Sequence, residues 1–159
     1  MTAQSLKLQK GFTLIELLVV IGILAILLAI TLIAINPARQ FGQANDTKRR
    51  SDATQILNGI SQYSASNAGN LPAEVSALVA NTTTVLNSTN FPNLCAQLVP
   101  TYLPALPVDP TGNDQDGIAA ADCAAPGGWN TQYSIARDAN NRITVTAPNA
   151  YTPPIQVTR

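Results

Sequence analysis

The hydrophobic pattern divides the chain into a long apolar run near the N-terminus and a mixed remainder. Residues 12–35 contain one charged side chain, Glu16, and only Gly22 and Thr31 interrupt residues 17–35. As a helix, those 19 residues would extend about 28 Å, close to the ~30 Å hydrocarbon core of a bilayer. The pattern therefore predicts a membrane-spanning helix. A carboxylate at its entrance is energetically costly, which makes Glu16 a candidate functional residue.

A second helical pattern follows the apolar run. Apolar residues at steps of three and four form one stripe, which consists of Ala53, Ile56, Leu57, Ile60 and Tyr63. Asn36-Pro37 lies between the two patterns, and because the helical pattern resumes after it, we expect a bend there rather than a stop. Residues 67–70, Asn-Ala-Gly-Asn, are typical of a helix end.

The opposite face of this second helix carries a dense group of charges. Lys48, Arg49 and Arg50 lie three or four positions from Asp46 or Asp52, a spacing that allows ion pairs along a helix. We interpret the group as a solvated helix face.

The remainder predicts irregular segments and then a small sheet. Residues 70–108 have little regular pattern, although Pro72 and Phe91 lie where short helices would start, and the Thr/Asn-rich residues 81–90 predict an exposed loop. The first short helix would have Val75, Leu78 and Val79 as its apolar face. Residues 133–137 and 143–147 alternate and predict a hairpin, with 155–157 as a short edge strand. A hairpin alone is marginal, so we expect the sheet to pack on the apolar stripe.

The amino-acid composition excludes several classes of function. Nine basic and nine acidic residues balance, and the one basic cluster is flanked by acids, so nothing indicates nucleic-acid binding. The absence of histidine from the sequence excludes Ser/His/Asp and Cys/His catalysis and histidine-ligated metals. No other pairing of a nucleophile with a base is visible. We therefore expect a protein that is not an enzyme.

The residues that begin the apolar run, Lys-Gly-Phe-Thr-Leu-Ile-Glu at 10–16, resemble the prepilin signal of type IV pilins and type II secretion pseudopilins. The resemblance covers Lys10 to Ile35. It implies that a membrane-embedded prepilin peptidase cuts between Gly11 and Phe12 and methylates the new amino group. It also implies that Glu16 helps subunits to assemble into a filament.

Two simpler interpretations of the N-terminus compete with this one. A secretory signal peptide begins with basic residues, here Lys7 and Lys10, but its apolar region is only about 7–15 residues long. An ordinary single-pass anchor fits the length of the run. It explains neither Gly11-Phe12 nor Glu16.

We therefore expect an α+β, pilin-like subunit in which a long N-terminal helix packs against a small C-terminal antiparallel sheet. Its parts would be a leader (1–11), a transmembrane and assembly half of the helix (12–36), and an extracytoplasmic globular domain (37–159). The resemblance implies as partners the prepilin peptidase/N-methyltransferase, a membrane assembly platform, and copies of the chain or related pilins. The precursor would cross the cytoplasmic membrane once and then join a cell-surface or periplasmic filament.

The function that follows is a structural subunit of a type IV pilus-like filament. The alternatives are a type II secretion pseudopilin and a membrane-tethered binding module that does not polymerise. Residues 106–112, Leu-Pro-Val-Asp-Pro-Thr-Gly, with Trp129 and Tyr133 after them, look like the Pro-x-Asp-Pro-x-Gly…Tyr pattern of major pseudopilins. Here the stretch 113–130 is longer than in that pattern.

The same loop is a candidate calcium site. Carboxylates on a flexible loop suit Ca²⁺, and major pseudopilins are similar in binding calcium near their sheet. The candidate ligands are Asp109, Asp114, Asp116 and Asp122. The alternative is a solvated acidic loop and no cofactor.

The two cysteines, Cys95 and Cys123, are 28 positions apart. In an exported protein such a pair predicts a disulfide. Two buried free thiols are the alternative, and a metal site is disfavoured because histidine partners are lacking.

Overall fold

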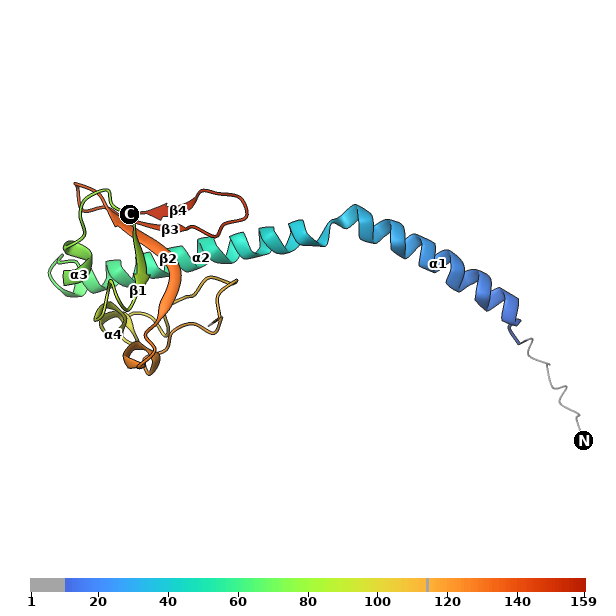
Figure 1. The fold of residues 1–159 in the computed structure, drawn as a ribbon, viewed down its shortest axis with the longest axis horizontal. Coiled ribbons are helices and arrows are strands. Elements are labelled where there is room, and N and C mark those ends of the chain that lie inside the picture. The colour runs from blue at the N-terminus through green and yellow to red at the C-terminus, as the bar shows by residue number, and fades with distance from the viewer. Residues whose placement is uncertain (1–10, 114) are drawn as a thin grey trace, which may run out of the picture. The chain divides into compact units, whose positions relative to one another are not determined.

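The computed structural model describes residues 11–113 and 115–159, so the leader lysines Lys7 and Lys10 lie outside the described residues. The chain forms two compact units, the first ending at Gln40 and the second running from Phe41 to Arg159. Figure 1 shows the elements in chain order. They are α1 (Leu14–Ile35), α2 (Pro37–Ser66), α3 (Ala73–Ser76), β1 (Thr84–Asn87), α4 (Leu94–Leu98), η1 (Asp122–Ala124), β2 (Asn130–Arg137), β3 (Ile143–Ala147) and β4 (Ile155–Thr158).

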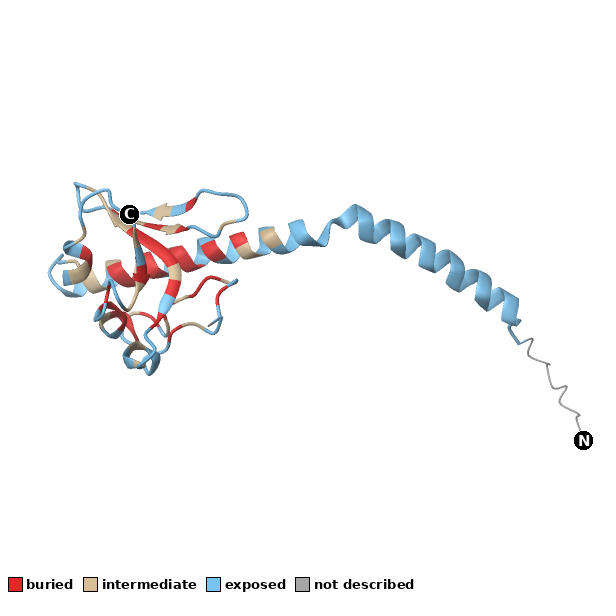
Figure 2. Cartoon of the chain, viewed as in Figure 1, coloured by how far each residue is buried: buried red, intermediate tan, exposed pale blue. Residues whose placement is uncertain are grey.

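Helix α1 is the predicted apolar helix. None of its 22 residues is buried within the chain (Figure 2). It is long and apolar enough to cross a membrane. An apolar helix exposed on every side needs lipid or other helices around it, because water is a poor solvent for such a surface.

The expected bend at Asn36-Pro37 is instead a break between two helices. Asn36 is not helical and has a left-handed backbone, with φ 46° and ψ 79°. A residue before proline is sterically disfavoured in the helical region, and asparagine tolerates the left-handed region better than most residues. Pro37 then begins α2, a position that suits proline because the first helical N–H has no intrahelical partner.

The sheet has four antiparallel strands in the order β1-β2-β3-β4. The predicted hairpin is confirmed as β2 and β3, with Ile135 opposite Val145, and the predicted edge strand is confirmed as β4. Strand β1 corrects the prediction of a loop over 81–90. It pairs Thr84 with Ile135 and buries Leu86 completely.

One core joins the sheet to α2. Of the predicted stripe, Ala53, Ile56, Leu57 and Ile60 are buried, with no more than 2% of any of them exposed. Tyr63 is partly buried and meets Tyr102 edge to face, with ring centroids 5.8 Å apart. The expected apolar face of α3 is only partly correct, because Val75 is buried and Val79 is 73% exposed. The chain thus has the α+β, pilin-like layout that the sequence predicts.

Candidate functional site

The bond predicted to be cleaved lies before α1. Gly11 and Phe12 are exposed and not helical, and α1 begins at Leu14. A Cβ atom built on Gly11 would meet nothing within 4 Å. Gly11 and Phe12 are therefore accessible on the surface of the chain.

Glu16 closes the first turn of α1. Its Oε2 atom accepts hydrogen bonds from the Thr13 backbone N–H at 2.8 Å and from the Thr13 hydroxyl at 2.7 Å. In return, the Glu16 N–H donates to Thr13 Oγ1 at 3.3 Å. This is a capping box. The spacing Thr-x-x-Glu in the sequence is its signal, which the prediction for Glu16 did not use.

A buried ion-pair network lies on α2, and its centre is Arg49. Arg49 Nε and Nη2 donate to Asp109 Oδ2 and Oδ1 at 2.7 and 2.9 Å, and Arg49 Nη1 donates to Asp46 Oδ1 at 3.0 Å. Asp46, Arg49 and Asp109 are 6%, 2% and 0% exposed. The prediction of a solvated face is therefore wrong for Arg49, Asp46 and the equally buried Asp52. It holds for Lys48 and Arg50, which are exposed.

Asp46 also fastens the segment between β3 and β4. It accepts hydrogen bonds from the backbone N–H groups of Tyr151 and Thr152, both at 2.8 Å, and from the Thr152 hydroxyl at 2.8 Å. Burial opposes ionisation of Asp46, but these bonds and the one from Arg49 outweigh it and lower its pKa to about 2. Asp46 is therefore ionised at neutral pH.

Asp52 makes a second connection between α2 and the sheet. Its Oδ2 accepts hydrogen bonds from the buried Tyr133 hydroxyl at 2.9 Å and from Lys48 Nζ at 3.0 Å. Burial and the bond to Asp52 raise the pKa of Tyr133. Tyr133 therefore stays protonated and acts as a hydrogen-bond donor.

The four candidate calcium ligands do not form one site among the described residues. Asp109 is engaged by Arg49 and also accepts a hydrogen bond from the Thr111 hydroxyl at 2.6 Å, so its carboxylate is part of the ion-pair network and not free for a metal. Asp114 lies outside the described residues. Asp116 and Asp122 line the same cavity of about 380 Å³. Within residues 11–113 and 115–159, no three acidic or cysteine side chains gather as a metal site would require.

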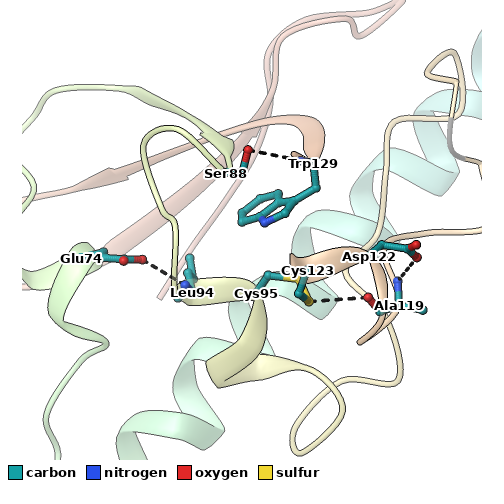
Figure 3. The surroundings of a disulfide bond; sticks show 8 residues. All are labelled: Glu74, Ser88, Leu94, Cys95, Ala119, Asp122, Cys123 and Trp129. Carbon is teal, nitrogen blue, oxygen red and sulfur yellow. Dashed lines mark hydrogen bonds between the residues drawn. A yellow bond between two sulfur atoms is a disulfide. The ribbon is translucent and has the colours of Figure 1, made fainter. Parts of the chain in front are cut away.

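The predicted disulfide is present. Cys95 of α4 and Cys123 of η1 are bonded, with their Cα atoms 5.4 Å apart (Figure 3). Glu74 holds the start of α4 by accepting a hydrogen bond from the Leu94 N–H at 3.0 Å, and Ser88 Oγ accepts one from the Trp129 N–H at 3.2 Å. The bridge therefore fastens the long segment before β2 to a helix that is itself anchored.

Comparison with known families identifies the N-terminus. Residues 6–32 match the family model described as the prokaryotic N-terminal methylation motif. This motif is the signal of type IV pilins and pseudopilins, and the chain carries it. It suggests a structural protein rather than an enzyme, and a membrane-anchored precursor. No curated protein and no solved structure matches the chain.

Proposed function

We propose that the chain is a pilin, the repeating or initiating structural subunit of a type IV pilus-like filament. The observation that carries the proposal is that α1, most of which lies within the methylation motif, exposes apolar side chains on every side. Such a helix fits a bilayer while the subunit waits in the membrane. It equally fits a bundle of identical helices once the subunits assemble.

The proposed sequence of events begins in the cytoplasmic membrane, which the precursor crosses once. A prepilin peptidase cuts between Gly11 and Phe12 and methylates the Phe12 amine, and an assembly platform then adds the subunit to the filament. Glu16 attracts the positive amine of a neighbouring subunit, because a charge inside a bundle of apolar helices is costly without a partner. Residues 37–159 form the part outside the membrane, and the filament lies at the cell surface or in the periplasm.

A pseudopilin of type II secretion is the second candidate. The specific observation in its favour is the segment 106–112, Leu-Pro-Val-Asp-Pro-Thr-Gly. This segment leads toward β2, since the Asp109 N–H donates to the Thr131 carbonyl at 3.0 Å. The long stretch 113–130 with its disulfide distinguishes the chain from the pattern of major pseudopilins.

The N-terminus of the chain in its own host tests the proposal. Intact-mass analysis should give a chain that begins at Phe12 and carries one added methyl group, and the sheared filament fraction should contain that chain. Gly11→Val is a further test. A Cβ atom at this position meets nothing within 4 Å, so a loss of cleavage reports recognition by the peptidase. A chain that keeps residues 1–11 would contradict the proposal. A cleaved chain that never enters filaments would indicate the non-polymerising tether.

A further inference from the structure

We propose that Phe41 and Tyr151 form an interfacial anchor, a pair of aromatic side chains that holds the start of the globular unit in the headgroup layer of the membrane. This inference rests on the proposed function to the extent that α1 spans that membrane. The occupant of the aromatic surface is lipid at the depth of the phosphate and glycerol groups.

The exposure of aromatic side chains is confined to one place in the second unit. Phe41 is 71% exposed and Tyr151 is 55% exposed. The other aromatic residues of 41–159 are buried or partly buried; they are Tyr63, Phe91, Tyr102, Trp129 and Tyr133. A fold that buries three aromatic rings, partly buries two and leaves two large rings in contact with solvent indicates a surface that is covered in the working state.

The Tyr151 ring lies against α2 at Gly42, the residue that follows Phe41. A Cβ atom on Gly42 would be 2.6 Å from Cγ of the Tyr151 ring, so the ring rests directly on the helix at the position after Phe41. The Tyr151 backbone is held there by the 2.8 Å hydrogen bond from its N–H to Asp46. The glycine is required for this contact, since any side chain at position 42 would displace the ring.

The chain cannot carry these rings far from the end of the membrane helix. Phe41 is six residues after Ile35. Their separation is therefore at most about 22 Å for a fully extended chain, and it is shorter here because α2 is helical from Pro37 onward. The Phe41 side chain, like others on a helix, is tilted toward the helix N-terminus, which for α2 is the end that connects to α1. The headgroup region extends roughly 5–8 Å beyond each side of the hydrocarbon core, so a Phe41 side chain that points back toward α1 can reach it.

The chemistry of the surface suits lipid headgroups better than a second protein. Aromatic side chains gather at membrane interfaces, where an apolar ring and, in tyrosine, a polar hydroxyl meet both phases. Arg39, two positions before Phe41, is an exposed cation near the membrane end of α2, where lipid phosphates attract positive charge. Two rings can cover a few hundred Å² at most, whereas a stable protein interface needs about 800 Å² from each partner.

Tryptophan fluorescence of the full chain in phospholipid vesicles tests the inference. Phe41→Trp is the main variant and Tyr151→Trp the second, each compared with the parent chain, in which Trp129 is buried. One set of vesicles carries a nitroxide on the headgroup, and another carries it deep in the acyl chain. Leu24→Trp, in the middle of α1, reports membrane insertion, and Val79→Trp, on an exposed residue of the second unit, reports a side chain in water.

We expect the headgroup nitroxide to quench the new tryptophan at 41 and at 151 more strongly than the deep nitroxide does. Leu24→Trp should show the reverse order, and Val79→Trp should be quenched by neither label. Emission from 41 and 151 that matches Val79→Trp, while Leu24→Trp is quenched by the deep label, would overturn the anchor and leave the membrane-spanning helix intact. The anchor is also overturned if the tryptophans at 41 and 151 are not quenched in vesicles and their emission shifts to the blue only in filaments. That result would assign the surface to a neighbouring subunit. Loss of deep quenching at Leu24→Trp would instead contradict the membrane-spanning role of α1.

Discussion

Arg49 and Asp109, sixty positions apart, form a fully buried ion pair with two hydrogen bonds of 2.7 and 2.9 Å. The guanidinium and carboxylate planes match in such a two-bonded arrangement, which lysine cannot reproduce. Burial opposes ionisation of Asp109, but the hydrogen bonds from Arg49 and Thr111 outweigh it and lower the pKa of Asp109. The pair therefore fixes the proline-rich segment that contains Asp109 to one place on α2.

Removal of Arg49 should be far more harmful than removal of its neighbour. Arg49→Met leaves Asp109 and Asp46 buried without their cation, and we expect a loss of about 3–5 kcal/mol in the free energy of unfolding. Arg50→Met is the matched control, because Arg50 is exposed and its loss should change stability by less than about 0.5 kcal/mol. Denaturant unfolding of the detergent-solubilised chain gives both values. Equal stability of the two variants would show that the pair does not hold the fold together.

Acid should weaken the contact between Asp46 and the segment that contains Tyr151. The pKa of Asp46 falls from 3.8 to about 2 on folding, so its ionised form stabilises the fold above about pH 4, and this contribution is lost as the pH falls through about 2. The difference corresponds to about 2 kcal/mol. We expect the gap in unfolding free energy between the parent chain and Asp46→Asn to be constant above pH 5 and to shrink by that amount toward pH 2. A gap that does not change with pH would contradict the assignment.

Local sequence patterns were sufficient for elements whose causes are neighbours in the chain. The alternation in residues 133–137 and 143–147 predicted β2 and β3. Ala68 and Gly69, with φ of 55° and 85°, end α2 where the sequence indicated. The N-terminal signal could likewise be recognised from the sequence, since it lies within residues 10–16.

The sequence was insufficient where the deciding partner is remote. The spacing of Arg49 and Asp46 is that of an ion pair on a helix surface. No residue near them in the sequence indicates that Arg49 is buried against Asp109. Strand β1 is only four residues long among polar neighbours, and what orders it is its pairing with β2. The hydrogen bond from the Thr131 hydroxyl to the Leu86 carbonyl, at 2.9 Å, joins residues 45 positions apart.

The disulfide should contribute measurably to stability. In the chain-entropy view, a bridge that closes a loop of 28 residues contributes roughly 3–4 kcal/mol. We expect the double variant Cys95→Ser, Cys123→Ser to lose up to that amount, and the reduced parent chain to lose about as much. Reductant should leave the double variant unchanged, which makes it the control. Two thiols that react with an alkylating agent in native, unreduced protein would contradict the bridge.

Glu16 should be needed for assembly and dispensable for insertion and cleavage. In the single chain the carboxylate is bound to Thr13 through Oε2, so a capping role and an assembly role must be separated. Glu16→Gln separates them, because the amide oxygen can still accept from Thr13 while the negative charge is gone. If the charge attracts the Phe12 amine of the next subunit, Glu16→Gln and Glu16→Ala should both reach the membrane, be cleaved, and form few filaments. Glu16→Asp keeps the charge with a shorter reach and should be partly defective in assembly.

Electron microscopy of sheared filaments measures assembly, and an immunoblot of the membrane fraction measures insertion and cleavage. Normal filament yield from Glu16→Gln together with loss in Glu16→Ala would assign Glu16 to the cap alone, and normal yield from both would remove it from assembly.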